Sequence, residues 1–184
     1  MAIMEISTDG LIEIASHEGL CLRPYFDSVG VLTWGIGHTK AAGPPDPALL
    51  PREEDQPIGA IFATFKNDLA AVEANVNKLV KVPLAQHEFD ALCSFDFNTG
   101  GLWRSSLLRS LNAGDHALAA EQFMGWSRPP EIIGRRKKEM VLFRDGTYSS
   151  GGKVNVFPVN AAGQPVYRQG RNIDVRPFLQ GEST

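Results

Sequence analysis

The chain has 184 residues, of which 43% are hydrophobic and 21% charged, so it can bury the core of one domain or of one domain with two lobes. This composition, which includes ten Phe, excludes an intrinsically disordered chain. A net charge of -3 and a pI near 5.8 give no overall attraction to nucleic acid or to an anionic surface, so we expect no nucleic-acid partner.

The first residues contain no basic segment, and Glu5 interrupts their apolar run. We therefore expect neither a signal peptide nor a membrane anchor, and we expect synthesis in the cytoplasm.

The first predicted element is a short helix over residues 9–18. Apolar residues recur at helical spacing from Leu11, and Gly19 supplies the stop. Glu18 follows Ile14 by four residues and Leu11 by seven, which puts it on the stripe that should face the core. Burial and the negative end of the helix both disfavour an ionised carboxylate, so Glu18 could serve as a general acid. The general rarity of buried Glu favours a solvated side chain instead, and both interpretations stay open.

A tight turn and a strand follow the helix. Residues 27–30 have the composition of a turn, in which Asp27 alone would be ordinary, and residues 31–36 alternate as a strand does. Thr33 shares one face of this strand with Gly35. We expect the bare face left by Gly35 and Gly37 to lie close to a ligand, because glycine otherwise weakens a strand.

At this point the residues resemble a known family. Eight residues separate Glu18 from Asp27, five separate Asp27 from Thr33, and Gly-Ile-Gly-His follows at 35–38. This pattern closely resembles the phage-type lysozymes, the T4-like muramidases. The resemblance implies Glu18, Asp27 and Thr33 as catalytic residues. It also implies an α+β, mainly helical fold with two lobes, a small N-terminal β-hairpin lobe and a larger helical lobe joined by a long helix.

The middle of the chain fits that architecture. Residues 40–57 contain five prolines and predict a loop, and apolar residues then recur every three or four positions over 58–80, which predicts a helix of about twenty residues. We expect a lysozyme-like catalytic domain over 1–146, with lobes at 1–57 and 80–146 and the linking helix at 58–80. Residues 147–184 would then be a C-terminal extension of unknown role.

Four further helices are expected after the linking helix. They cover about 84–97, the region of Leu107 to Leu111 capped by Ser105 or Ser106, 115–126 and 132–143. Four parts of this region again resemble the family: Phe97-Asn98-Thr99-Gly100, the run from Leu107 to Asp115, Trp126, and the run from Gly134-Arg135-Arg136 to Glu139. The resemblance puts the following residues near the sugar chain: Thr39, Phe97, Asn98 and Ser106. For Phe97, a core aromatic is an equally good interpretation.

The four cations at 135–138 are typical of a solvated helix face, and the alternative is an arginine paired with Glu139 or with a carboxylate of the cell wall. Cys21 and Cys93 are expected to be two reduced, buried thiols. His17 and Cys21 stand four apart beside a Glu, but the second histidine of a zinc helix is missing, so we predict no metal site.

Residues 147–184 lie outside the resemblance. Valine-rich stretches near 154–159, 166–167 and 173–175 predict two or three short strands, or else an extended tail packed on the helical lobe.

The resemblance implies a muramidase, an endolysin-type glycoside hydrolase that cuts the β-1,4 bond between N-acetylmuramic acid and N-acetylglucosamine, with inversion and without a cofactor. Its partners would be peptidoglycan glycan strands, met by a monomer after release or delivery to the cell wall or periplasm. A non-catalytic peptidoglycan-binding or phage-structural module and a hydrolase of chitin-like polymers are the alternatives. Whether the chain is a phage endolysin, a prophage enzyme or a secreted effector stays open.

Overall fold

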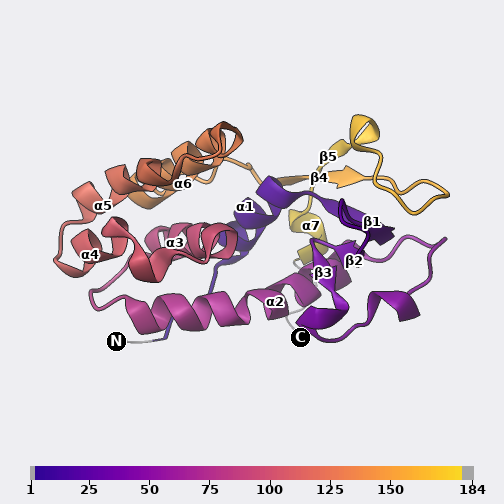
Figure 1. Cartoon of the computed structure of the whole chain (residues 1–184), viewed down its shortest axis with the longest axis horizontal. Helices are drawn as coiled ribbons and strands as arrows, with labels where there is room; N and C mark the ends of the chain where they lie inside the picture. The colour runs from indigo at the N-terminus through magenta and orange to yellow at the C-terminus, as the bar shows by residue number, and fades with distance from the viewer. Residues whose placement is uncertain (1–2, 180–184) are drawn as a thin grey trace. The chain divides into compact units, whose positions relative to one another are not determined.

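The structure is a computed structural model that describes residues 3–179, shown in Figure 1. Its contacts divide the chain into two compact units. The helical unit consists of the chain up to Glu13 together with Leu69–Ser149, and the sheet unit consists of Ile14–Asp68 together with the chain from Ser150 onward. Among the described residues, no helix combines the length and the apolar character needed to cross a bilayer.

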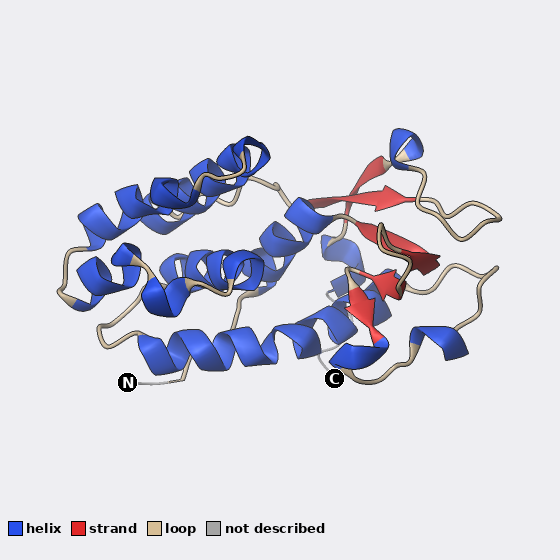
Figure 2. Cartoon of the chain, viewed as in Figure 1, coloured by secondary structure: helices blue, strands red, loops and turns tan. Residues whose placement is uncertain are grey.

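The predicted helices are present with small shifts of their ends. Seven α-helices lie within the described residues: α1 Thr8–Glu18, α2 Ile58–Leu79, α3 Gln86–Thr99, α4 Ser106–Asn112, α5 His116–Gln122, α6 Ile133–Asp145 and α7 Arg176–Leu179. The helix predicted over 115–126 ends earlier, because Phe123–Trp126 forms a 3₁₀-helix. With the sheet of Figure 2, these helices confirm the α+β, mainly helical class. The role of α2 as a link between two lobes stays a prediction.

Aromatic side chains fill the core of the helical unit. Phe95 of α3 meets Phe123 edge-on, with 5.4 Å between ring centroids, and Phe123 packs in turn on Phe143 of α6 at 5.5 Å. All three side chains are buried. Of the two candidate cap serines it is Ser105 that begins α4, because its Oγ accepts the N–H of Leu108 at 3.0 Å.

The sheet unit is organised around a five-stranded sheet with the order β3-β2-β1-β4-β5. The strands are β1 Leu20–Phe26, β2 Leu32–Gly35, β3 His38–Thr39, β4 Lys153–Phe157 and β5 Arg171–Asp174. Successive strands β1, β2 and β3 pair antiparallel, which confirms the predicted hairpin. Residues 40–57 form a loop, as predicted, that contains only two short 3₁₀-helices.

The C-terminal segment belongs to this sheet. β4 pairs in parallel with β1, where Leu20 stands opposite Val156 and Cys21 opposite Phe157. Two strands were therefore predicted correctly, but the strand expected near Val166 is wrong, since Tyr167–Gln169 is a 3₁₀-helix. The alternative of an extended tail on the helical lobe is also wrong, because hydrogen bonds to β1 satisfy the backbone of this segment better than an unpaired tail could.

Both cysteines are buried and free of disulfides, as predicted. Cys21 lies in β1 and Cys93 in α3, so each thiol is packed inside a different unit.

Candidate active site

Glu18 is the last residue of α1, in the sheet unit. The helix starts after Ser7, whose Oγ accepts the N–H of Gly10 at 3.0 Å, and it ends where the N–H of Gly19 donates to the Ala15 carbonyl at 2.8 Å. Glu18 is exposed, so the prediction that it lies on the buried stripe is wrong. The spacing did place it in line with Leu11 and Ile14. Burial of a last-turn residue depends on what covers the helix end, which the helical period does not contain.

Asp27 is held by the turn that joins β1 to β2. Its Oδ1 accepts the N–H of Val29 at 3.0 Å and that of Val31 at 2.8 Å, while its own N–H donates to the Val31 carbonyl at 3.0 Å. All hydrogen bonds between this carboxylate and the described residues go to Oδ1. The turn therefore fixes the side chain while leaving Oδ2 accessible to a ligand, because Asp27 is only half-buried.

Thr33 lies in β2, where it stands opposite both Tyr25 of β1 and Thr39 of β3. Residues directly opposite one another share a face of the sheet, so the sheet brings these three side chains together. The Thr33 hydroxyl is buried and donates to the Val31 carbonyl at 3.0 Å. A hydroxyl with its proton so engaged still has lone pairs that can accept a hydrogen bond from water.

Tyr25 is a member of this group that the sequence reasoning missed. Burial raises the pKa of the Tyr25 hydroxyl, and a backbone hydrogen bond from Gly37 only partly opposes the shift. The phenol therefore stays neutral beside Thr33 and Thr39. Its position opposite Thr33 could have been found by pairing β1 with β2 around the predicted turn.

The two glycines of the bare strand face have different explanations. A Cβ at Gly35 would lie 2.8 Å from Cγ2 of Ile61, so the space is taken by α2. The prediction that Gly35 makes room for a ligand is therefore wrong. A Cβ at Gly37 would meet no atom within 4 Å, so this position is open.

His38 anchors β3 to the loop that follows and to α2. Its Nδ1 lies 2.9 Å from Oδ2 of Asp68, and its Nε2 lies 2.9 Å from the Pro45 carbonyl. Both ring nitrogens thus lie within hydrogen-bonding distance of an oxygen atom. His38 is only 2% exposed, so these bonds hold the loop after Thr39 in place.

The remaining predicted substrate contacts belong to the helical unit. Phe97 is half-buried near the end of α3, Asn98 is exposed, and Ser106 is half-buried at the start of α4. Phe97 is therefore not a core aromatic of the kind that Phe95 is. That these residues contact the same sugar chain as Glu18 stays a prediction.

The run of four cations at 135–138 is only partly solvated. Arg135 and Arg136 are buried, and both donate to Glu139, which is 1% exposed and also accepts the Ser94 hydroxyl at 2.7 Å. Burial raises the pKa of Glu139, and the two guanidinium groups oppose that shift. The solvated-face interpretation is wrong for these two arginines, while the alternative pairing with Glu139 is confirmed. Arg136 also donates through Nη2 to Oδ1 of Asn98, so this cluster orients a predicted sugar contact.

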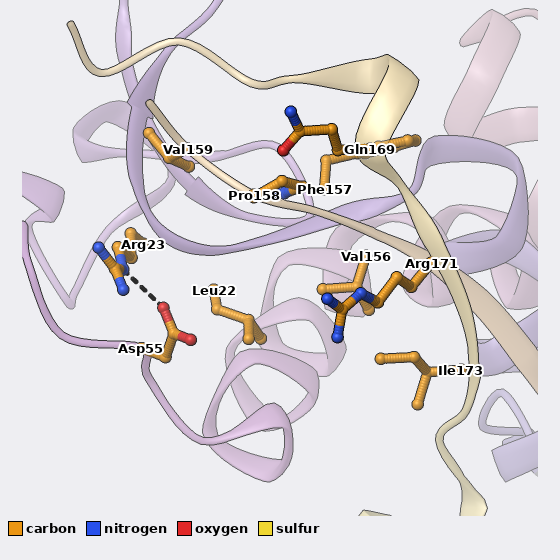
Figure 3. A pocket seen from close by; sticks show the side chains of 10 residues that line it. All are labelled: Leu22, Arg23, Asp55, Val156, Phe157, Pro158, Val159, Gln169, Arg171 and Ile173. Atoms are coloured by element: carbon orange, nitrogen blue, oxygen red, sulfur yellow. Dashed lines mark hydrogen bonds and ion pairs between the residues drawn. The ribbon is translucent and has the colours of Figure 1, made fainter. Parts of the chain in front are cut away.

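A groove of about 500 Å³ opens on the sheet unit (Figure 3). Leu22 and Val156 line it, Arg23 pairs with Asp55 at 2.6 Å on one side, and Phe157 borders it. Neither Glu18 nor Asp27 is among its lining residues.

Comparison with known proteins places this chain in a family. The Phage lysozyme family matches residues 15–139, a range that includes every predicted catalytic and substrate-binding residue. The endolysin of Acyrthosiphon pisum secondary endosymbiont phage 1 is 37% identical over 151 residues, covering 76% of this chain and 98% of the relative.

Solved structures agree with the sequence match. A mutant of P22 lysozyme aligns with a TM-score of 0.68 and 33% identity, over 76% of this chain and 98% of that one. The muramidase domain of SpmX from Asticaccaulis excentricus aligns with a TM-score of 0.63 and 30% identity, over 76% and 97% of the two chains. The chain belongs to the phage lysozyme family and is a glycoside hydrolase of the lysozyme type.

Proposed function

We propose that this lysozyme is an endolysin-type muramidase in which Glu18 protonates the leaving oxygen of the β-1,4 bond between N-acetylmuramic acid and N-acetylglucosamine. Ionised Asp27 stabilises positive charge on the sugar ring or helps to activate water, and Thr33 orients that water. The proteins named above are an endolysin, a lysozyme and a muramidase domain, which supports peptidoglycan as the substrate. The enzyme then acts as a monomer on the cell wall, after another agent has released or delivered it.

The single observation that carries the proposal is the way the turn holds Asp27. Two backbone N–H groups donate to Oδ1 and fix the orientation of the carboxylate, while Oδ2 accepts no hydrogen bond from the described residues. A fixed anion of this kind can stabilise an oxocarbenium-like ring without having to reorganise. Glu18 complements it as an exposed side chain at a helix end, where a glycan can reach the carboxyl group.

Thr33 is the third residue of the proposed mechanism. Its hydroxyl proton is engaged by the Val31 carbonyl, so its free lone pairs can accept a hydrogen bond from the attacking water. Attack by a held water inverts the configuration at the sugar carbon, and it requires a gap of roughly 6.5 to 9.5 Å between the two carboxyl groups.

The test uses purified peptidoglycan, with release of reducing ends as the readout. Glu18→Gln keeps the shape of the side chain but cannot give up a proton, so we expect kcat to fall by about 10²-fold to 10⁴-fold. Glu121→Gln, on the exposed face of α5, is the matched control and should retain full turnover. A Glu18→Gln enzyme that clears cell walls at the normal rate would overturn the assignment of the acid.

The product identifies the substrate class and the stereochemistry. Proton NMR of the first sugar released should show the inverted anomer before it equilibrates. Cleavage of chitin oligomers at the same rate as peptidoglycan would contradict muramidase specificity, and binding without any release of reducing ends would contradict the enzyme.

The substrate contacts are tested through KM. We propose that Thr39, Phe97, Asn98 and Ser106 bind the glycan strand without taking part in bond cleavage. Alanine at each position should raise KM for peptidoglycan while leaving kcat within about twofold, the pattern expected when uniform binding is lost. A variant with unchanged KM would remove that residue from the substrate contacts.

A further inference from the structure

We propose that strand β4 is a positioning element for Glu18 and that it acts through the Phe157 ring. The inference rests on the proposed function, in which Glu18 is the acid. It gives a role to the C-terminal strands, which lie beyond residue 139, where the family match ends.

A single residue connects Glu18 to the sheet. Gly19 separates α1 from β1, and it adopts a φ of +72°, a conformation that favours glycine. The N–H of Gly19 closes the last turn of α1 by donating to the Ala15 carbonyl at 2.8 Å. The direction in which Glu18 leaves the helix end therefore depends on how Gly19 is held.

Phe157 lies directly against Gly19. A Cβ at this glycine would lie 2.5 Å from Cε2 of Phe157 and 3.3 Å from the Asn155 carbonyl oxygen. Both neighbours belong to β4. The glycine is thus needed for its backbone conformation and for the close approach of an aromatic ring from the C-terminal part of the chain.

The residues that follow Gly19 are fixed by the same strand. Leu20 stands opposite Val156 and Cys21 opposite Phe157 in the parallel pairing of β1 with β4. Backbone hydrogen bonds of β4 thus hold the start of β1, while the Phe157 side chain covers the residue before it. Glu18 therefore precedes a junction that β4 holds through backbone and side chain together.

The Phe157 ring is itself held from its other side. A Cβ at Gly170 would lie 2.5 Å from Cε1 of Phe157, and the Tyr167 ring packs edge-on at 5.1 Å between centroids. Both residues lie in or next to the 3₁₀-helix before β5. The ring packs between Gly19 at one edge and Gly170 at the other, so it has little freedom to move away from the end of α1.

The test compares substitutions on β4 by steady-state kinetics on peptidoglycan, well below the melting temperature. Phe157→Ala should lower kcat by about 10-fold or more with KM within about twofold, because a displacement of the acid by about 1 Å costs rate rather than binding. Phe157→Tyr keeps the ring edges beside both glycines and should restore kcat to within about twofold of the wild-type value.

Val154→Ala is the matched control for lost stability. Val154 is fully buried in the same strand, but its partner is Ile173 of β5 and not a residue of β1. It should lower Tm by about 5 °C, as a buried truncation does, while kcat stays at the wild-type value. If Val154→Ala and Phe157→Ala reduce kcat equally, β4 supports the fold alone and the proposal is overturned.

A double-mutant cycle tests the contact itself. Gly19→Ala introduces a Cβ where the ring lies, so its effect on kcat should be smaller in a Phe157→Ala background than in the wild type. Additive effects on kcat would show that the ring and the glycine act independently, and they would overturn the proposal.

Failure of this inference differs from failure of the proposed function. If Glu18→Gln is inactive while Phe157→Ala has normal kcat, Glu18 is the acid and β4 does not position it. If Glu18→Gln is fully active, the assignment of the acid is wrong and β4 loses the residue it was proposed to position.

Discussion

Glu18 in the sheet unit and Glu139 in the helical unit show two uses of the same side chain. Glu139 is 1% exposed, and two arginines and Ser94 donate to it. Glu18 is exposed at the end of α1. The buried carboxylate is committed to the fold by its partners, whereas the exposed one can meet a substrate. A raised pKa does not by itself identify a catalytic acid, because ionic clusters of the core also perturb pKa values.

The largest effect on stability should come from breaking the buried cluster. Glu139→Gln leaves Arg135 and Arg136 buried without their counter-charge, so we expect a loss of about 3–5 kcal/mol in the free energy of unfolding. Urea denaturation followed by circular dichroism measures it. Lys138→Gln, on the exposed part of the same helix, is the control and should leave the midpoint unchanged. A Glu139→Gln protein as stable as the wild type would place the cluster among contacts that the fold does not need.

A smaller loss in the free energy of unfolding is expected when the contact between His38 and Asp68 is broken. His38 is 2% and Asp68 15% exposed, so His38→Asn should cost about 2 kcal/mol through the loss of a charge-assisted hydrogen bond. His116, 37% exposed beside Glu88, is the matched partner for comparison, and His116→Asn should cost under about 1 kcal/mol. Thermal unfolding of the two variants measures the difference. Equal shifts in Tm would show that burial does not strengthen this kind of pair.

The third prediction concerns a buried group that must stay neutral. Burial raises the pKa of the Cys21 thiol from 9.0 to about 12, so the folded protein keeps this proton in a pH range where the unfolded chain loses it. The stabilising contribution is complete below pH 9 and declines between pH 9 and pH 12, by about 1.4 kcal/mol per pH unit at most. Cys21→Ser should reduce the slope of unfolding free energy against pH in this range. An unchanged slope would assign the alkaline sensitivity to other groups.

The smallest effect is expected at the two proposed catalytic carboxylates, exposed Glu18 and half-buried Asp27. Glu18→Gln and Asp27→Asn should each change the free energy of unfolding by less than about 0.5 kcal/mol, because each amide keeps the shape of the side chain and an oxygen that can accept hydrogen bonds. Asparagine at 27 retains an oxygen that can accept the N–H groups of Val29 and Val31. Urea denaturation beside the kinetic assays checks this. A loss above 2 kcal/mol at either position would mean that the carboxylate holds the fold as Glu139 does.

The helices could be predicted from sequence because their apolar period and caps are local signals. α2 was expected over 58–80 and lies at Ile58–Leu79, and α1 ends at Glu18, directly before the glycine that indicated its end. For Glu18 the buried position is wrong and the solvated alternative is confirmed, whereas for Arg136 the solvated face is wrong and the pairing with Glu139 is confirmed. In both cases the spacing along one helix was correct, but exposure depends on what other parts of the chain pack against it.

The sheet was predictable only in part, for a related reason. The turn at Asp27 and the strand carrying Thr33 follow from local composition. Tyr25 was missed as a member of the same region, since it joins Thr33 by pairing across strands. His38 was named in the motif at 35–38, but its bond to Asp68, far along the chain, was not predicted. The pairing of β4 with β1 has no local signal at all, because its partners come from opposite ends of the sequence.

That pairing has a consequence for biosynthesis. Ribosomes deliver the N-terminal part of a chain first, and contacts between distant residues form late because they must close a long loop. β1 therefore cannot pair with β4 until Lys153–Phe157, far along the chain, have been translated. A chain that is truncated before β4, or still being translated there, would leave the start of β1 without one of its two neighbouring strands. The sheet beside Glu18 is therefore completed only after translation has passed β4.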